Sequence, residues 1–465
     1  MNAAFAAPEF DPALVARYDV DGPRYTSYPT APHFHAGFDE AALCEAIRAS
    51  NEEPIPRDLS LYLHVPFCAS PCFYCGCNRV ITRDPGKADA YLGHLCREIA
   101  LTAPLFDRDR RVRQLHLGGG TPNFLDLPRL RVLMTNLARH FTLAGEGGRE
   151  FGIELDPRYA DGDYVRGLAG LGFNRLSVGI QDFDPAVQRA VNREQSVGET
   201  YAVIDAARDA GFASVSVDLI YGLPKQSPVG FGRTLSAVLA LTPDRIAVYG
   251  YAHLPAMFKA QRQIHAADLP DAATRLALFG QALERLTGAG YVYVGMDHFA
   301  RADDELVRAQ RAGRLQRNFQ GYSTHGDTDI VGLGASAIGR IGDSYSQNAR
   351  DLPAYYAALD AGRLPVTRGR RLSEDDLLRR EAIGQLMCHG ELDTGAFGRR
   401  HGLIFACHFA TALARLRPLA DDGLVTFERG VIRVTPRGRL LLRIVAMCFD
   451  AYLDAPAAAR YSRAI

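Results

Sequence analysis

The chain has 465 residues, 47% of them hydrophobic, and its 53 basic and 53 acidic side chains give a formal net charge of zero. This length suggests about two to three domains of ~150 residues each. The balanced charge gives no support for nucleic acid or another polyanion as a partner. No run of ~18 apolar residues is present, so we expect no membrane-spanning helix.

Residues 1–57 predict an extension before the first strand. The first residues lack a basic segment and carry Glu9 and Asp11, which is unlike a secretory signal. Nine cysteines without an export signal are typical of reduced thiols or metal ligands in the cytoplasm, where we expect the protein. Residues 24–31 read RYTSYPTA, and their polar composition alone favours a surface loop. Residues 38–50 predict a short amphipathic helix.

Four of the cysteines share one short stretch with the spacing CxxxCxxCxC: Cys68, Cys72, Cys75 and Cys77. A disulfide, a tetrahedral zinc site or an iron–sulfur cluster can each use such thiols. Zinc ribbons pair two separated CxxC knuckles, whereas the other cysteines here are scattered singly. A compact loop with CxxxCxxC can reach three corners of a cubane cluster. The spacing by itself leaves the zinc and disulfide alternatives open.

From residue 59 to about residue 300, predicted strands alternate with predicted helices. We expect strands at 59–65, 112–117, 151–155, 175–179, 214–220 and 245–249. We expect helices at 87–103, 127–140, 197–210, 229–241 and 272–289, and a loop followed by a helix that ends at Arg193. Connections of helix length between strands imply right-handed βαβ units and a parallel sheet. Six consecutive units suit an open barrel or a doubly wound sheet.

Polar or glycine-rich segments recur where each predicted strand ends. The cysteine loop follows the first strand, and GGGTP at residues 118–122 follows the second. The later strands end near Glu154, Asp156, Gln181, Asp182, Asp218, Tyr249, Tyr251 and His253. Polar residues at the carboxyl ends of parallel strands are typical of an α/β active-site face. Any one of them can be a strand-end residue without function, but six in succession favour a site.

Some of these residues point to a chemistry of their own. Glycine lets a backbone approach a ligand closely. A carboxylate buried at a barrel mouth, as expected for Glu154, needs an ammonium group or ribose hydroxyls as partners. Tyr62 can present its ring to a sulfonium, although core packing explains it equally well. His64 shares the strand face of Tyr62 because side chains alternate, so we expect it to be a catalytic polar neighbour of the cysteine loop.

After residue 290 the strand–helix alternation gives way to three segments of different composition. Residues 290–348 are rich in glycine, hydroxyls and amides, which predicts loops and short strands at a barrel edge. Residues 349–370 predict a linker with a short helix. From residue 371 onward, Ser373 and Asp376 predict a capped helix that runs toward Met387.

Further elements are expected in residues 371–465: helices at 394–401, 405–416 and from 436 onward, and hairpin strands at 424–427 and 431–434. Three helices and a hairpin resemble a winged helix. No distinct basic recognition helix is present, so we interpret this mostly helical domain as a lid or packing domain and not as a DNA-binding one.

The cysteine loop after a strand, with an aromatic residue before its third cysteine, resembles the radical S-adenosylmethionine (SAM) superfamily. Together with CxC, RYTSYPTA, GGGTP, NREQ and YGLPKQ, it resembles the bacterial oxygen-independent coproporphyrinogen III oxidases from about Gly22 to the last helix. The resemblance implies an α/β protein with a partial (β/α)6 radical SAM barrel at 58–348, residues 1–57 contributing to the active-site cover, and a winged-helix-like domain at 371–465.

The resemblance also implies the cofactors and their ligands. A [4Fe–4S] cluster is held by Cys68, Cys72 and Cys75, whereas Cys77 matches a fourth cysteine that is not a cluster ligand. A first SAM molecule meets Gly119 through its amino group and also meets Ile338, and Tyr62 and Glu154 join this cofactor-binding set. The residues implied around a second SAM molecule are Tyr74, Gly120, Thr121, Gln181, Arg193, Asp218 and Ala252. Gln320 is implied to lie on the substrate side and, with His64, forms the expected catalytic pair.

The reaction that the resemblance implies is the oxidative decarboxylation of two propionates of coproporphyrinogen III to vinyl groups, which gives protoporphyrinogen IX. An unidentified low-potential electron donor and an electron acceptor are expected as partners, and nucleic acid and membranes are not. We expect a monomer. A tetracarboxylate substrate needs cationic or hydroxyl-rich partners, for which we expect Arg24 and the hydroxyl groups of residues 25–30.

Two other classes of protein compete with this interpretation. A radical-SAM-like haem chaperone shares the CxxxCxxC core but binds and delivers haem. The combination of Cys77, RYTSYPTA and NREQ favours the oxidase. A zinc-stabilised structural or nucleic-acid-binding protein needs a second pair of ligands near the loop, and the sequence shows none there.

Overall fold

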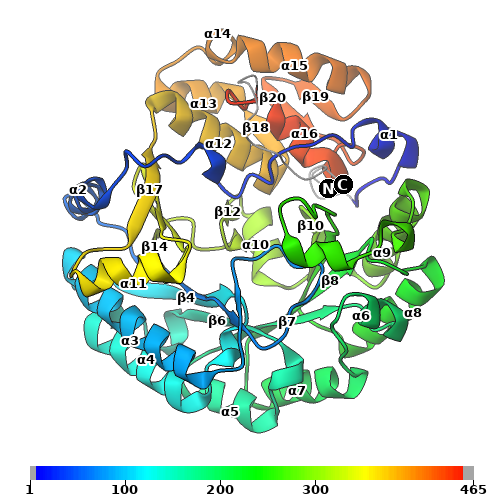
Figure 1. Cartoon of the computed structure of the whole chain (residues 1–465). Helices are drawn as coiled ribbons and strands as arrows, with labels where there is room; N and C mark the ends of the chain where they lie inside the picture. Colours follow the sequence, from blue (N-terminus) through cyan, green and yellow to red (C-terminus); the bar gives the residue numbers. More distant parts are fainter. Residues whose placement is uncertain (1–6, 454–465) are drawn as a thin grey trace. The chain divides into compact units, whose positions relative to one another are not determined.

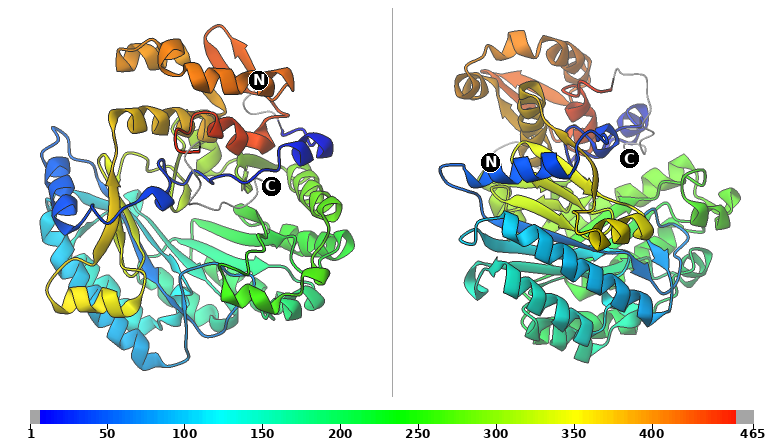
Figure 2. Two further views of the ribbon diagram at one scale, coloured as in Figure 1. Left: turned by 45° about the horizontal axis from the view of Figure 1, so that its top comes forward. Right: turned by 60° about the vertical axis from the view of Figure 1, so that its left-hand side comes forward.

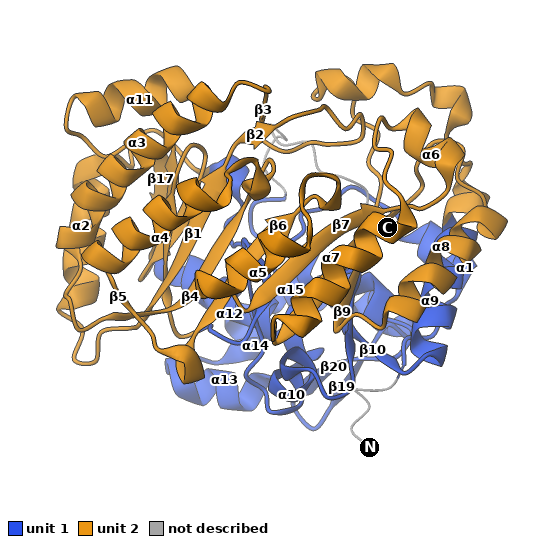
Figure 3. Ribbon diagram, turned by 90° about the horizontal axis from the view of Figure 1, so that it is seen from below, with its two compact units in different colours: residues 1–33, 276–326, 372–465 blue, residues 34–275, 327–371 orange. Residues whose placement is uncertain are grey.

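The computed structural model describes residues 7–453. The chain forms two compact units, each assembled from segments that are distant in sequence (Figure 3). Unit 1 comprises residues 1–33, 276–326 and 372–465, and unit 2 comprises residues 34–275 and 327–371. None of the described helices is long and apolar enough to cross a membrane.

Unit 2 is built on a sheet of parallel strands that follow the order of the chain. The neighbouring strands are β1 (Leu59–Val65), β4 (Arg111–Gly119), β6 (Glu150–Leu155), β7 (Arg175–Gln181), β8 (Ser214–Tyr221) and β9 (Arg245–Gly250). All six predicted strands are confirmed, and none of their ends is displaced by more than two residues. The α/β class and the succession of strand–helix units are therefore as expected.

Helices cover the outer side of this curved sheet (Figure 1). They are α3 (Pro85–Thr102), α4 (Leu127–His140), α5 (Gly162–Gly170), α7 (Val197–Asp209) and α8 (Pro228–Leu241). Each begins after an aspartate or serine whose side chain accepts a hydrogen bond from a first-turn amide. In α4 the buried residues recur at helical spacing: Leu130, Leu133, Met134 and Leu137.

One helix after β7 is shorter than predicted. The segment expected to be helical as far as Arg193 contains only α6 (Pro185–Ala190). Asn192 adopts a left-handed conformation with φ 54°, which ends the helical path and redirects the chain. Helix α5 was not predicted, and α9 (Ala272–Gly288) confirms the helix expected at 272–289.

The sheet continues beyond β1 with four more strands, of which the first is parallel to β1 and the others pair antiparallel. β14 (Asp329–Leu333) pairs in parallel with β1 and leads to β15 (Ile338–Ile341), β16 (Ser344–Asn348) and β17 (Val366–Arg371), which pair antiparallel. Part of the segment expected to be a linker is therefore a strand, and α11 (Leu352–Asp360) confirms its short helix. Helix α2 (Glu40–Asn51) confirms the helix expected at 38–50 and contacts β15 and β17 (Figure 2).

Unit 1 contains two small hairpins besides its C-terminal elements. β10 (Tyr291–Gly295) pairs with β11 (His298–Arg301), and β12 (Gln316–Asn318) pairs with β13 (Gly321–Ser323). Its helices before residue 372 include α1 (Pro12–Arg17), which was not predicted, and α10 (Glu305–Arg311).

The C-terminal part of unit 1 largely follows the prediction. Ser373 and Asp376 form the expected capping box of α12 (Glu374–His389). The helix expected at 405–416 is divided, because α14 (Phe405–His408) stops before α15 (Ala410–Asp421). The other elements are α13 (Thr394–His401), β18 (Glu391–Asp393), β19 (Val425–Glu428), β20 (Val431–Val434), a 3-10 turn (Arg439–Leu441) and α16 (Leu442–Met447). Strand β18 was not predicted and pairs with β20.

Candidate functional site

A cavity of about 200 Å³ lies in unit 2 at the carboxyl ends of the parallel strands. The cysteine loop and the ends of β4, β6, β7 and β8 line it. Most of the predicted site residues meet there: Cys68, Cys72, Tyr74, Cys75, Gly119, Gly120, Thr121, Glu154, Gln181, Arg193 and Asp218. The succession of polar strand ends seen in the sequence thus forms one site.

The cysteine loop is held by short backbone and side-chain contacts. β2 (Phe67–Cys68) pairs with β3 (Val80–Ile81) and closes the loop at its base. Arg79 donates from Nη1 to the carbonyl oxygen of Cys75 at 2.9 Å and from Nη2 to that of Cys72 at 3.2 Å. Its guanidinium therefore fixes two of the three proposed ligand residues and adds a positive charge beside them.

The thiols of the loop differ in their ease of ionisation. A hydrogen bond from Cys77, followed by the nearby Arg79 charge, lowers the pKa of Cys75 to about 6 against the effect of burial. Burial raises the pKa of Cys68 to about 11, while the hydroxyl of Thr121, 3.3 Å from its Sγ, acts in the opposite direction. Cys75 is therefore present as the thiolate, the form that binds metal, more readily than Cys68.

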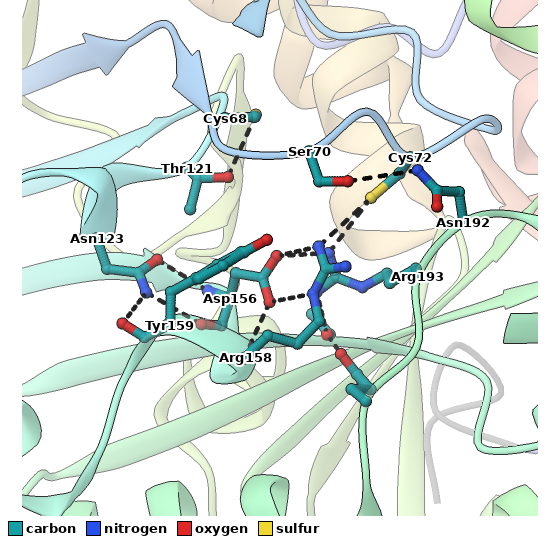
Figure 4. Close-up of polar contacts among 12 residues, drawn as sticks. Cys68, Ser70, Cys72, Thr121, Asn123, Asp156, Arg158, Tyr159, Asn192 and Arg193 are labelled. Carbon is teal, nitrogen blue, oxygen red and sulfur yellow. Dashed lines mark hydrogen bonds and ion pairs between the residues drawn. The ribbon is translucent and has the colours of Figure 1, made fainter. Parts of the chain in front are cut away.

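Asp156 binds two arginines at the floor of the cavity (Figure 4). Arg193 Nη1 lies 2.9 Å from Oδ2, and Arg158 Nη2 lies 2.7 Å from the same oxygen. Burial acts to raise the pKa of Asp156, but the two guanidiniums outweigh it and hold the pKa below its ordinary value. Both arginines also approach the sulfur of Cys72, at 3.6 Å from Arg193 and 3.8 Å from Arg158.

Two further carboxylates face the same cavity. Glu154 is less buried than expected, with 44% of its side chain exposed, and contacts Nε2 of His116 at 3.2 Å. The amide of Gly119 donates to its other oxygen at 3.3 Å. Burial, reinforced by the negative charge of Glu154, raises the pKa of Asp218 to about 7. The carboxyl of Asp218 can therefore either donate or accept a hydrogen bond near neutral pH.

Two glycines of the GGGTP segment, Gly119 and Gly120, leave no room for a side chain. Gly119 has φ 120°, and a Cβ there would lie 2.7 Å from the ring of His64. At Gly120 a Cβ would lie 2.8 Å from the backbone of Pro66 and Phe67. The GGGTP segment therefore packs directly against the start of the cysteine loop.

His64 is not among the residues that line the cavity. Its Nε2 is 3.0 Å from the carbonyl oxygen of Asn78, which can only accept, so Nε2 carries the proton. Nδ1 then accepts a hydrogen bond from the hydroxyl of Tyr62 at 3.2 Å. Burial lowers the pKa of His64, so the imidazole is neutral at pH 7. The ring of Tyr62 stacks on His116 with 6.1 Å between centroids, so this tyrosine supports the partner of Glu154.

The other predicted residues outside the cavity lining are Ala252, Ile338 and Gln320. The Nε2 group of Gln261 donates to the carbonyl oxygen of Ala252 at 3.1 Å and to that of Tyr74 at 2.9 Å, which joins two residues expected at the second SAM molecule. Ile338 is the first residue of β15 in unit 2. Gln320 belongs to unit 1, where it lies on the turn between β12 and β13.

The sequence interpretation missed several residues of this site. Arg79, Arg158, Tyr159 and Ser177 line the cavity but were not selected. Arg158 follows Asp156 and Pro157 directly after a strand, a position that could have drawn attention to it. Arg79 carries no comparable signal, because its role depends on reaching back across the loop to Cys72.

The Tyr25 and Tyr28 hydroxyl groups, expected to meet the substrate, are engaged within unit 1. Tyr25 donates to Oδ2 of Asp450 at 2.9 Å, and the amide of Ala451 donates to the Tyr28 hydroxyl at 3.0 Å. These contacts anchor the RYTSYPTA segment. Arg24 is paired with Asp297, with 2.8 Å between Nη2 and Oδ2.

Known proteins resemble the chain over almost its whole length. Residues 62–238 match the radical SAM superfamily, and residues 372–441 match the HemN C-terminal domain. The chain is 49% identical to the oxygen-independent coproporphyrinogen III oxidase of Pseudomonas aeruginosa, over 98% of this chain and 99% of that one. It is 48% identical to the Escherichia coli protein of the same name, over 96% of each chain.

A solved structure shares the fold. The structure of E. coli coproporphyrinogen III oxidase (HemN), described as a radical SAM enzyme, matches with a TM-score of 0.91 and 47% identity. The match covers 96% of this chain and 100% of that one.

Proposed function

This chain belongs to the family of oxygen-independent coproporphyrinogen III oxidases, and we propose that it converts coproporphyrinogen III to protoporphyrinogen IX. Each of two propionates loses carbon dioxide, a hydrogen atom and one electron and becomes a vinyl group. The observation that supports this proposal most directly is that four cysteines, three of them the proposed cluster ligands, line one cavity together with the polar ends of four neighbouring strands.

The residues present fit a [4Fe–4S] cluster and SAM, the cofactors of this family. Cys68, Cys72 and Cys75 lie on one loop at the cavity, and the loop is fixed by Arg79. When bound, the cluster and SAM supply the one-electron chemistry that removes a hydrogen atom from a substrate propionate. The chain's own contribution is to hold the three cysteines in a set geometry and to line a partly enclosed cavity from which water can be displaced.

We also propose that the cavity accommodates a second SAM molecule. Arg193 is nearly buried, its Nε has no hydrogen-bond partner among the described residues, and it lies beside Arg158. A bound carboxylate can share these guanidiniums with Asp156. Asp218 and Gln181 face the same space and can receive ribose hydroxyls. We propose that the first SAM molecule contacts Gly119 and Glu154. Tyr62 supports Glu154 by stacking on His116, and Ile338 is a further proposed contact.

His64 and Gln320 are still proposed to contribute to the reaction, His64 as a positioning residue and Gln320 as a substrate contact. His64 is neutral and bonded through both ring nitrogens, so its contribution is to hold Tyr62 and the end of the cysteine loop in place. Gln320 and Arg24 are proposed to meet the substrate. Four further points stay predictions: a low-potential electron donor, an electron acceptor, a monomeric state and a cytoplasmic location.

An anaerobic assay read by mass spectrometry tests the proposed function. The reconstituted protein is mixed with SAM, a low-potential reductant, coproporphyrinogen III and an electron-accepting cell extract. We expect the loss of two carbon dioxide units. Cys68→Ser should abolish this loss, whereas Cys407→Ser, at an exposed cysteine of unit 1, should retain it.

Two outcomes would overturn parts of the proposal. If SAM is cleaved while the porphyrinogen stays intact, the substrate is wrong. If SAM is not cleaved and the purified protein retains haem, delivery of haem becomes the better interpretation.

A further inference from the structure

Two side-chain nitrogens on one hairpin of unit 1 are buried without a hydrogen-bond partner among the described residues: Nη1 of Arg317 and Nε2 of Gln320. Arg317 lies on β12 opposite Tyr322 of β13, and Gln320 lies on the turn between the two strands. Buried N–H groups are nearly always paired in folded proteins, because leaving them unpaired is costly. Two of them on one short hairpin therefore indicate a position for an acceptor that comes from outside the chain.

The contacts of Arg317 hold its guanidinium in a defined place. Its Cζ lies 4.8 Å from the centroid of the Tyr322 ring, a cation–π distance. Its Nε donates a long hydrogen bond of 3.4 Å to the carbonyl oxygen of Arg24. The Tyr322 hydroxyl donates to the carbonyl oxygen of Met387 at 3.0 Å, so the supporting ring is itself anchored. The guanidinium is thus preorganised, with Nη1 left for another group.

The surroundings of this hairpin carry an excess of positive charge. Arg24 and Arg317 supply two cations, and Asp297 is the carboxylate paired with Arg24. His298 stands with its ring edge-on to Tyr322, at 5.5 Å between centroids. Burial, and then the charge of Arg317, lowers the pKa of His298 to about 4, so this imidazole adds no charge at pH 7. The same positive potential that disfavours protonation of His298 attracts an anion.

We infer that Arg317 and Gln320 form a binding site for one carboxylate of the substrate, with Arg24 as the neighbouring cation. This inference rests on the proposed function, because coproporphyrinogen III is a tetracarboxylate. A guanidinium N–H and an amide N–H supply two donors, and the planar guanidinium suits a carboxylate better than an ammonium does. Arg317 thereby selects the substrate by recognising the substrate's carboxylates, and it takes no part in the radical chemistry.

The test measures binding of coproporphyrin III, the fluorescent oxidised form with the same four carboxylates, to the reconstituted protein by fluorescence anisotropy. Arg317→Gln should raise its Kd roughly 10- to 100-fold, the range expected for a hydrogen bond to a charged group. Arg314→Gln, at an exposed arginine just before the hairpin, should leave the Kd unchanged. The tetramethyl ester of the same porphyrin serves as a probe without carboxylates, and its Kd should be the same for wild type and Arg317→Gln.

Decarboxylation kinetics give a second readout. Arg317→Gln should raise KM for coproporphyrinogen III more than it lowers kcat, while iron content and SAM cleavage without substrate remain those of the wild type. Gln320→Ala, which leaves no buried charge unpaired, should weaken coproporphyrin binding several-fold, and it decides the question if Arg317→Gln fails to fold.

Distinct results overturn this site and the proposed function. A wild-type protein that cleaves SAM but leaves the porphyrinogen intact refutes the function. An active wild type whose Arg317→Gln or folded Gln320→Ala variant binds coproporphyrin III with unchanged affinity refutes only the carboxylate site. An equal loss of affinity for the acid and for the ester also refutes it, because that pattern reflects a structural role.

Discussion

Arg193 and Asp156 form an ion pair with both side chains more than nine-tenths buried, and Nη1 lies 2.9 Å from Oδ2. Arg158 contacts the same carboxylate oxygen at 2.7 Å, so one negative charge faces two positive ones. This excess of positive charge allows the two arginines to bind a second carboxylate. In the proposed function that carboxylate belongs to SAM, and Asp156 keeps both arginines in place before it arrives.

Replacing Asp156 should therefore affect stability and SAM binding in opposite ways. Asp156→Asn leaves two buried guanidiniums without their counter-charge and should lower the free energy of unfolding by about 3 kcal/mol. Added SAM should raise the Tm of this variant more than that of the wild type, because its carboxylate replaces the missing one. Thermal unfolding with and without SAM measures both effects.

Asp163→Asn is the matched control, because Asp163 is 86% exposed and its contact with Arg166 is a surface pair. We expect a change within about 0.5 kcal/mol for this control. If SAM stabilises Asp156→Asn less than the wild type, the proposed sharing of the arginines is wrong.

Arg79 should control the reduction potential of the cluster. Reduction adds a negative charge to the cluster, so a nearby guanidinium stabilises the reduced form. Arg79→Gln should shift the potential to more negative values by tens of millivolts, where about 59 mV corresponds to a tenfold change in a one-electron equilibrium. A redox titration of the reconstituted protein, followed by electron paramagnetic resonance, measures the shift.

Arg79→Lys separates charge from geometry, because an ammonium group keeps the charge but cannot reproduce the planar fork that reaches both carbonyl oxygens. Its potential should stay closer to the wild-type value, while iron should be lost faster on dilution with a chelator. Arg131→Gln, at an exposed arginine of α4, should change neither quantity. Equal potentials for Arg79→Gln and Arg79→Lys would exclude the electrostatic role.

Asp218 should make the cofactor-free protein less stable as the pH rises. Its pKa is about 7 in the folded protein and lower in the unfolded chain, so unfolding releases a proton between about pH 4 and pH 7. Stability from this group is present at low pH and is lost, at up to about 1.4 kcal/mol per pH unit, as the pH rises through that window. Above pH 7 the loss is complete.

Asp218→Asn should reduce this slope without abolishing it, because burial also raises the pKa of Glu98 to about 7. Urea unfolding of the reduced apoprotein at several pH values measures the slope. Asp205→Asn, at an aspartate with 65% exposure, should keep the wild-type slope. An unchanged slope in Asp218→Asn would show that Asp218 titrates normally in the folded protein.

The sequence predicted the strands of unit 2 well because these are buried apolar runs that end at glycine or polar residues. It failed at β17, where only one of six side chains is buried, so the strand reads as a polar linker. Its backbone nevertheless pairs with β16, and no side-chain pattern reports that pairing. The helix expected to reach Arg193 ended early because a left-handed residue, Asn192, interrupts a sequence that is otherwise compatible with a helix.

The candidate site was predictable where a residue type and a strand end coincide, as at Glu154 and Asp218. Arginines that bridge segments were not predictable. Nothing in the sequence distinguishes Arg79 or Arg317 from other arginines. Only the folded chain shows that Arg79 reaches two carbonyl oxygens of the cysteine loop and that Arg317 has a buried Nη1. The division into two units also escaped prediction, because each unit joins segments that lie far apart in the sequence.

Asp329 should be the most sensitive carboxylate for the stability of unit 2. It pairs with Arg110 at 2.6 Å, with side chains 0% and 1% exposed, and also accepts hydrogen bonds from Ser50 and from the amide of Gly342. Asp329→Ala leaves Arg110 buried without a counter-charge and should cost about 3–5 kcal/mol of unfolding free energy in urea. Asp327→Ala, at an exposed aspartate two residues earlier, should stay within about 0.5 kcal/mol.

The double variant Arg110→Met with Asp329→Leu distinguishes the cost of an unpaired charge from the loss of a favourable pair. An apolar pair of similar volume removes both charges, so it should recover most of the stability lost in Asp329→Ala. Iron content after reconstitution should then equal that of the wild type, because neither residue lines the site cavity. If the double variant is as unstable as Asp329→Ala, the hydrogen bonds from Ser50 and Gly342, and not the ion pair, hold the start of β14 in place.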